Sequence, residues 1–140
     1  MTKKILASGI MTEKVIVARL GNSFSQIMEF FTRHRIQHLP VAYDDKVLGI
    51  ISVNDMLKFM ADQLQNNPQI SHEMLNEAFD LDKEMTHKPI SVSPDTPLID
   101  ILEVLSDGKF QALPVVEGGE IKGIITNKDI VRVYHWDLTH

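Results

Sequence analysis

The sequence predicts an α/β (α+β) fold built from two copies of a β-α-β-β-α unit. A strand–turn–strand pattern that ends in a hydroxyl residue and an aspartate occurs at residues 39–55 and again at residues 113–129. Equivalent positions are 74 residues apart throughout, as Gly49 and Gly123 show. Amphipathic helical patterns precede and follow each copy. An internal repeat of this length is best read as one supersecondary unit that has been duplicated.

Size and composition agree with this interpretation. The chain has 140 residues, of which 44% are hydrophobic and 24% charged, as in an ordinary soluble globular protein. Each copy alone, at roughly 60 residues, would bury too little surface to be more than marginally stable. We therefore expect the two copies to share a buried face.

Composition also excludes several classes of protein. The net charge of −5 and the lack of a basic stripe argue against nucleic-acid binding. The chain has no cysteine, which excludes disulfides and thiolate metal sites. No apolar run approaches the ~18 residues that span a bilayer, and the first residues make a poor signal peptide. We therefore expect a cytoplasmic protein with no membrane segment.

In the first copy, residues 15–18 form a short β-branched run that predicts a strand. Asn22 or Ser23 can cap a helix over residues 24–34, whose apolar residues recur at helical spacing. The runs 36–42 and 47–53 are short and almost continuously apolar, which favours buried strands joined by a hairpin. Asn54 and Asp55 then open a further helix.

The second copy repeats these elements in the same order. A strand around Ile90 and Val92 precedes a helix with Pro97 near its first position and an apolar stripe from Leu98 to Leu105. A second hairpin follows, and Lys128–Asp129 open the last helix. The predicted divisions are residues 1–63 for the first repeat, 64–80 for a connector and 81–140 for the second repeat.

The connector is too apolar for a flexible linker. Its pattern over residues 70–81 predicts a helix, weakly capped by Ser71, that packs on the repeats. The alternative is a helix that binds a partner.

The repeated pattern Gly-x-x-Ser/Thr-x-x-Asp has a chemical interpretation. Gly49 and Gly123 allow the backbone to turn or to approach a neighbour closely. The hydroxyl residues Ser52 and Thr126 stand where free helix amides can bind a phosphate. An aspartate three residues later can accept two hydrogen bonds from a vicinal diol such as ribose. The same residues also make an ordinary helix cap, and spacing alone leaves that alternative open.

These residues resemble a tandem pair of CBS domains, a Bateman module. The resemblance rests on Met11-Thr12 and Met85-Thr86, on Leu-Pro-Val at residues 39–41 and 113–115, and on the segments 49–55 and 123–129. It covers nearly the whole chain. It implies that the two β-α-β-β-α repeats pack with pseudo-twofold symmetry and bind AMP, ADP, ATP or S-adenosylmethionine in clefts between them.

The resemblance also implies a role for individual residues. The motif aspartates would bind ribose hydroxyls. The motif serine or threonine and the residue before each aspartate would lie near phosphate or ribose. The first strand of each copy would hold adenine, and the residues before Leu-Pro-Val would reach phosphates. In the first copy these are Val15, Ile16, Val17, Gln37, His38, Ser52, Asn54 and Asp55, and in the second Pro89, Ile90, Ser91, Gln111, Thr126, Lys128 and Asp129.

The two copies predict unequal sites. Lys128 places a cation where the first copy has neutral Asn54, whereas His38 stands where the second copy has Ala112. Phosphates need cations or a metal such as Mg²⁺ to neutralise them, so we expect a charged ligand to prefer the site with Thr126, Lys128 and Asp129. No cofactor is otherwise required.

Catalysis is not expected, because no nucleophile–base pair, metal set or P-loop is present. We expect a stand-alone regulatory module that forms a homodimer and passes the presence of its ligand to another protein. Two alternatives remain: a structural dimerisation module with empty clefts, and a small metal-dependent hydrolase using His34, His38 and Asp44-Asp45. The spacing of the histidines disfavours a metal pair, and Asp44-Asp45 suit a turn.

Overall fold

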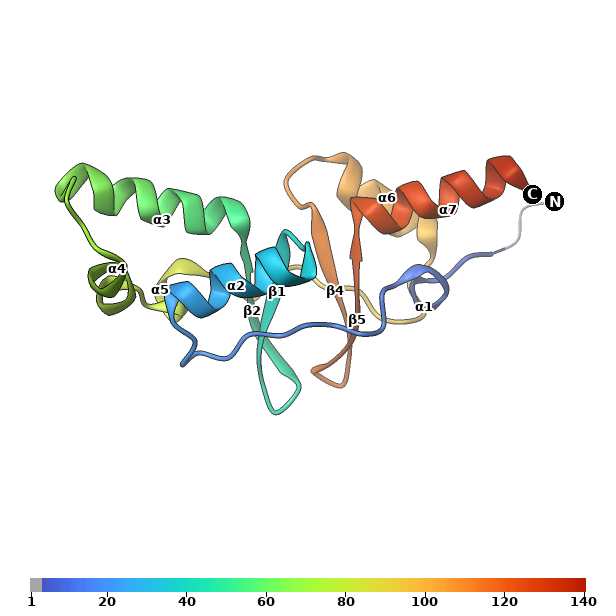
Figure 1. Ribbon diagram of the computed structural model, residues 1–140. Coiled ribbons are helices and arrows are strands. Elements are labelled where there is room, and N and C mark those ends of the chain that lie inside the picture. Colours follow the sequence, from blue (N-terminus) through green and yellow to red (C-terminus); the bar gives the residue numbers. More distant parts are fainter. Residues whose placement is uncertain (1–3) are drawn as a thin grey trace. The chain divides into compact units, whose positions relative to one another are not determined.

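The computed structural model describes residues 4–140, which form two compact units (Figure 1). We name each unit after its motif aspartate. The Asp55 unit comprises residues 16–44 and 48–88, and the Asp129 unit comprises residues 4–15, 45–47 and 89–140. Both units mix helices with strands, as the sequence predicts. Among residues 4–140, no helix has the length and apolar character needed to cross a bilayer.

The Asp55 unit contains four helices, and its sheet pairs β2 with both β1 and β3. The partner β3 is antiparallel to β2, with Gly49 opposite His87 and Ile50 opposite Thr86. Its elements are α2 (Phe24–His34), β1 (His38–Tyr43), β2 (Lys46–Ser52, from Leu48 on), α3 (Val53–Asn66), α4 (His72–Ala78), α5 (Leu81–Glu84) and β3 (Thr86–His87).

Helix α2 confirms the predicted range 24–34. Its start is fixed by a capping box: the Gln26 amide donates to the Ser23 hydroxyl at 3.2 Å, and the Ser23 amide donates to the Gln26 side chain at 2.9 Å. Its end is fixed by Arg35, which adopts the left-handed conformation at φ 53°. Local chemistry therefore sets both ends of this helix.

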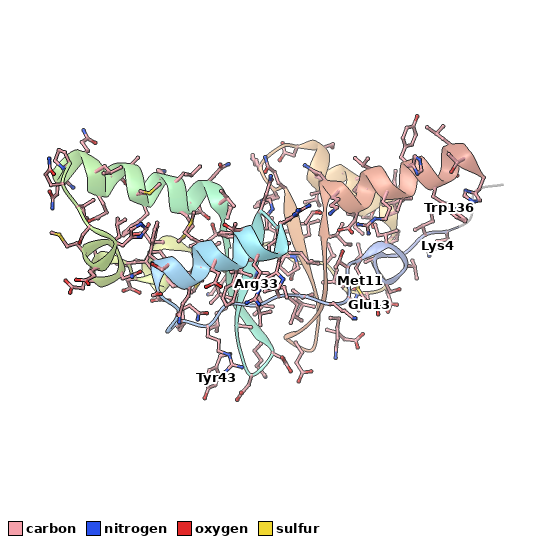
Figure 2. The ribbon with its side chains drawn as sticks, in the orientation of Figure 1. Lys4, Met11, Glu13, Arg33, Tyr43 and Trp136 are labelled. Atoms are coloured by element: carbon pink, nitrogen blue, oxygen red, sulfur yellow. The ribbon has the colours of Figure 1, made fainter. Side chains whose placement is uncertain are left out.

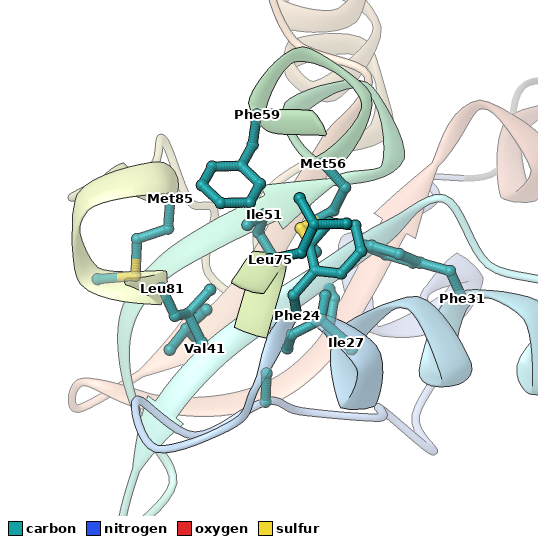
Figure 3. Packing of buried hydrophobic residues seen from close by; sticks show 12 residues of the cluster. Phe24, Ile27, Phe31, Val41, Ile51, Met56, Phe59, Leu75, Leu81 and Met85 are labelled. Carbon is teal, nitrogen blue, oxygen red and sulfur yellow. The ribbon is translucent and has the colours of Figure 1, made fainter. Parts of the chain in front are cut away.

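Three aromatic rings pack together in the Asp55 unit, and Figure 3 shows two of them, Phe24 and Phe59. The ring of Phe59 lies 5.7 Å from that of Phe24 and 5.2 Å from that of Phe79, the latter in edge-to-face geometry at 80°. Phe24 comes from α2, Phe59 from α3, and Phe79 follows α4. The connector therefore packs on the repeat, as predicted, and it supplies part of the core.

The connector differs from the prediction in its continuity. A single helix was expected over residues 70–81, but α4 ends at Ala78 and a separate α5 begins at Leu81. Phe79 and Asp80 between them are extended, and the Asp80 side chain accepts from the Asp82 amide at 3.1 Å to cap α5. The break allows Phe79 to join the core. The predicted cap at Ser71 is present, because its hydroxyl accepts from the Met74 amide at 3.2 Å.

The Asp129 unit is organised around one antiparallel hairpin. In this hairpin Leu113 lies opposite Ile125 and Pro114 opposite Ile124, and Leu113, Val115 and Ile125 are fully buried. Its elements are α1 (Ala7–Ile10), α6 (Leu98–Ser106), β4 (Ala112–Glu117), β5 (Glu120–Thr126) and α7 (Asn127–Thr139).

The predicted strand at residues 15–18 is wrong in extent. Only Ala18 pairs, in a single parallel bridge with Val41, and the chain turns at once because the Asn22 amide bonds the Arg19 carbonyl at 2.9 Å. The second copy behaves alike, since Val92 bridges Val115 alone. The β-branched residues favoured a strand, but the turn that follows limits the pairing to a single bridge.

The two motif glycines are required by close approach of another chain segment. A Cβ on Gly49 would lie 2.6 Å from the Thr86 carbonyl oxygen and 2.7 Å from the Met85 sulfur. A Cβ on Gly123 would lie 2.5 Å from the Met11 sulfur. Each Met-Thr pair thus packs on the glycine of the other sequence repeat, which explains why the compact units do not follow the repeats.

Candidate functional site

The carboxylate of Asp55 lies at the amino end of α3. Its Oδ2 accepts from the Ser52 amide at 2.8 Å, and the Asp55 amide donates to the Ser52 hydroxyl at 3.1 Å. This is the helix-capping arrangement that spacing predicted. Within residues 4–140, however, Oδ1 of Asp55 accepts no hydrogen bond, and the side chain is only half-buried. The cap therefore uses one carboxylate oxygen and leaves the other without a protein donor in this part of the chain.

Gln37 and His38 lie beside this carboxylate. The Gln37 carbonyl accepts from the Val53 amide at 3.0 Å, which ties the start of β1 to the start of α3. Burial lowers the pKa of His38 below its ordinary value of 6.5, and the negative charge of Asp55 offsets part of that shift. His38 is therefore a neutral imidazole near Asp55 at neutral pH, and it is half-buried.

The carboxylate of Asp129 is in a different state, with only 2% of the residue exposed. Its Oδ2 accepts from the Thr126 amide at 2.8 Å and from the Thr126 hydroxyl at 3.4 Å. Its Oδ1 accepts from the Thr12 hydroxyl at 2.9 Å and from the Arg132 guanidinium at 3.3 Å. Protein donors therefore surround both oxygens.

Met11 and Thr12, which directly follow α1, contribute to the surroundings of Asp129. Figure 2 shows Met11 on the segment that leaves α1. The Thr12 amide donates to the Ile124 carbonyl at 2.9 Å, and the Ile124 amide donates back to Thr12 at 3.0 Å. This reciprocal pair holds the Thr12 hydroxyl against Asp129.

The remaining predicted residues divide between the two units. No side-chain hydrogen bond within residues 4–140 joins the segments predicted to hold adenine to either aspartate. Lys128 and Asn54 are exposed, and Lys128 forms no ion pair within those residues. The Asp55 unit holds Ile16, Val17, Gln37, His38, Ser52, Asn54 and Asp55, whereas the Asp129 unit holds Val15, Pro89, Ile90, Ser91, Gln111, Thr126, Lys128 and Asp129.

No metal centre is found in the described part of the chain, where no three His, Asp or Glu side chains come together. Asp44 and Asp45 occupy the hairpin turn with φ 47° and 64°, in the left-handed region that aspartate tolerates. The turn interpretation of this pair is therefore confirmed.

Thr12 and Arg132 were not among the predicted site residues. The repeated Met-Thr pair was visible in the sequence, but nothing local indicates that it contacts a motif 117 residues away. The glycines offered the only signal, because a residue without Cβ in a buried strand often marks a place where another backbone approaches.

A family model of the CBS domain matches residues 7–62 and 78–135. The chain spans less than half the length of the curated relatives it matches. Among solved structures, it superposes on AcuB from Vibrio cholerae with a TM-score of 0.86 and 24% identity, covering 99% of this chain and 97% of that one.

Two further structures contain ligands. CBSX2, a CBS-pair protein of Arabidopsis thaliana, was solved in complex with AMP, with a TM-score of 0.77, 26% identity and coverage of 94% and 96%. The CBS domain pair of protein MJ0100 was solved with 5-methylthioadenosine and S-adenosyl-L-methionine, with a TM-score of 0.74, 25% identity and coverage of 93% and 99%. All three ligands share the adenosine moiety.

Proposed function

Because this chain belongs to the CBS domain family and carries two of its domains, we propose that it is a regulatory module that binds an adenosine-containing ligand. The observation that carries the proposal is the half-buried Asp55 carboxylate, whose Oδ1 accepts no hydrogen bond within residues 4–140. The ligands of CBSX2 and MJ0100 support the choice of adenosine.

In this proposal the ribose diol donates to Asp55. Its oxygen Oδ2 is held in place by the Ser52 amide, so the carboxylate is already oriented for a ligand. The Ser52 hydroxyl and the first amides of α3 lie next to it, where a phosphate would meet positive partial charge. Ile16 and Val17, both half-buried, would contact the adenine ring.

The charge near Asp55 favours a ligand with few phosphates. His38 is neutral at neutral pH, and Asn54 brings no charge. AMP or S-adenosylmethionine would then bind without a metal, whereas ADP or ATP would bring Mg²⁺ with the phosphates. Gln37 and His38 would donate hydrogen bonds to the phosphate or its substitute.

The family resemblance predicts a second ligand at the equivalent positions of the second copy. They are Pro89, Ile90, Ser91, Gln111, Thr126, Lys128 and Asp129. The burial of Asp129 weighs against our expectation that a charged ligand prefers this copy. Asp55 is therefore the primary site in the proposal.

Calorimetric titration with AMP, ADP, ATP and S-adenosylmethionine tests the proposal, with ATP measured with and without Mg²⁺. We expect micromolar binding of at least one, and a loss of about tenfold or more in affinity for Asp55→Asn. Asp62→Asn is the matched control, because Asp62 is an exposed aspartate on the same helix. Neither heat nor a thermal shift with all four compounds would contradict the proposal.

We also propose that the chain is a homodimer, because the helices that follow the two motifs, α3 and α7, expose apolar residues at equivalent positions. Leu57 and Leu64 on α3 are 47% and 42% exposed, and their counterparts on α7, Val131 and Leu138, are 66% and 68% exposed. Residues seven apart lie on one helix face, so each helix presents an apolar stripe. A second copy offers the same stripes in return.

Sedimentation analysis tests the dimer directly. We expect a dimer for the native chain and a shift toward monomer for Val131→Lys/Leu138→Lys. Lys58→Glu, which changes charge on α3 outside the stripe, should leave the dimer intact. A native chain that stays monomeric at high concentration contradicts this proposal and also removes the purely structural alternative, a dimerisation module without ligand.

Because a regulatory module acts on something else, we further propose that ligand binding is transmitted to another protein or domain. We propose no catalytic role for this chain, and the metal-dependent hydrolase has no three-residue metal cluster in residues 4–140 to support it.

A further inference from the structure

We propose that Asp129 fastens the amino-terminal segment to the second repeat and binds no ligand, so that each chain binds one adenosine-containing molecule, through Asp55. The inference rests on the proposed function and refines it. It assigns different roles to two aspartates that have the same place in a duplicated motif.

The count of hydrogen bonds separates the two aspartates. A carboxylate offers about four lone-pair positions, two on each oxygen. Four protein donors fill those of Asp129: the Thr126 amide and hydroxyl, the Thr12 hydroxyl and the Arg132 guanidinium. At Asp55 the Ser52 amide alone donates among residues 4–140. A ribose diol therefore finds acceptor capacity at Asp55 and none at Asp129.

The equivalent donors exist in the Asp55 unit but do not reach its aspartate. Thr86 corresponds to Thr12, and its side chain is exposed and makes no hydrogen bond with Asp55. Lys58 corresponds to Arg132, and it forms no ion pair with Asp55. The two sites therefore differ in bonding although the threonine and the aspartate are the same residues in both.

Burial makes the arrangement at Asp129 costly to undo. With only 2% of Asp129 exposed, a ligand would have to displace Thr12 before its hydroxyls could reach Oδ1. Thr12 is held in turn by its two backbone hydrogen bonds with Ile124. If Thr12 is displaced, the buried Asp129 carboxylate loses a hydrogen bond, which costs free energy unless another donor replaces it.

The test combines binding with thermal stability in one set of variants. Calorimetry of the full chain with AMP and with S-adenosylmethionine should give a stoichiometry of one per chain. Asp129→Asn should keep that stoichiometry and bind within about twofold of the native affinity, whereas Asp55→Asn should lose about tenfold or more. For the unliganded protein, Asp129→Asn should lower the melting temperature by several degrees and Asp55→Asn by much less.

Thr12→Val provides a second route should Asp129→Asn fail to fold. It removes the hydroxyl with little change of shape, and we expect a lower melting temperature with unchanged affinity. The matched control is Thr86→Val, which should leave both unchanged. The double variant Thr12→Val/Asp129→Asn should lose less than the sum of the two single losses, because both remove the same hydrogen bond.

The results separate this inference from the proposed function. Two ligands per chain, or a tenfold loss of affinity in Asp129→Asn, overturns the inference while the proposed function stands. If none of the compounds binds, the proposed function fails, and the inference is then decided by the melting temperatures. Additive losses for Thr12 and Asp129, or equal losses for Thr12→Val and Thr86→Val, overturn it in that case.

Discussion

The hydroxyl of Thr12 donates a hydrogen bond of 2.9 Å to the carboxylate of Asp129, 117 residues later in the chain. Its counterpart Thr86 makes no such bond with Asp55. Duplication therefore produced two motifs with the same residues at the key positions and different bonding. Among residues 4–140, Oδ1 of Asp55 accepts no hydrogen bond, whereas protein donors contact both oxygens of Asp129.

A methyl group on Gly49 should destabilise the protein strongly. The Cβ of Gly49→Ala would meet the Thr86 carbonyl oxygen at 2.6 Å, and backbone cannot move aside cheaply. We expect a loss of about 1–3 kcal/mol in the free energy of unfolding, the range for overpacked cores. Urea denaturation measures it.

Gly9→Ala is the matched control for that substitution. Gly9 lies in α1, and a Cβ there would have nothing within 4 Å. Alanine is the better helix former, so this variant should be neutral or more stable by about 0.5–1 kcal/mol. Equal losses for the two variants would contradict the close packing of β3 on Gly49.

Removal of the Phe59 ring should cost about 3–5 kcal/mol, the usual loss for a buried phenylalanine. Phe59 is 4% exposed and contacts the rings of both Phe24 and Phe79. Phe59→Ala therefore removes contacts of the repeat with its connector. Tyr43→Ala is the control, since Tyr43 is 71% exposed at the end of β1 (Figure 2) and its loss should be small. Comparable denaturation midpoints for the two variants would argue against the aromatic core.

The stability of the protein should fall on acidification in part because of His38. Its folded-state pKa is below the unfolded value of 6.5, so the unfolded chain binds a proton first as the pH drops. The contribution of His38 is complete above 6.5 and is lost as the pH falls from 6.5 through the folded pKa. Urea denaturation at pH about 7.5 and about 5.5 measures the loss.

His38→Gln should reduce that pH dependence, because glutamine does not titrate. His72→Gln, at an exposed histidine of α4, should leave it unchanged. The same difference between the two pH values in native protein and His38→Gln would show that other groups cause the acid sensitivity.

Sequence reasoning succeeded where the determining chemistry is local. Helix α2 was predicted to its last residue because Ser23 and Gln26 cap it and the apolar residues recur at helical spacing. The motif glycines were predicted to allow a close approach, and Met85 and Thr86 do approach Gly49. The strand expected at residues 15–18 was wrong because a turn at Arg19–Asn22 leaves one bridge, at Ala18.

Contacts between residues far apart in the chain were not predicted from the sequence. Helix α1 and strand β3 were not predicted, since each is short and β3 exists only through its pairing with β2. The pattern at Asp55 and Asp129 was left open between helix capping and ligand binding, and the structure confirms the caps. The contact of Thr12 with Asp129 comes from the other copy, so no spacing within one copy of the motif contains that information.

The central claim is that Asp55 binds the ribose of an adenosine-containing ligand. Calorimetric titration of AMP and S-adenosylmethionine into the native chain, Asp55→Asn and Asp62→Asn tests it most directly. The account predicts micromolar binding by the native chain and Asp62→Asn, with about tenfold or greater weakening in Asp55→Asn alone. Unchanged affinity in Asp55→Asn would contradict it.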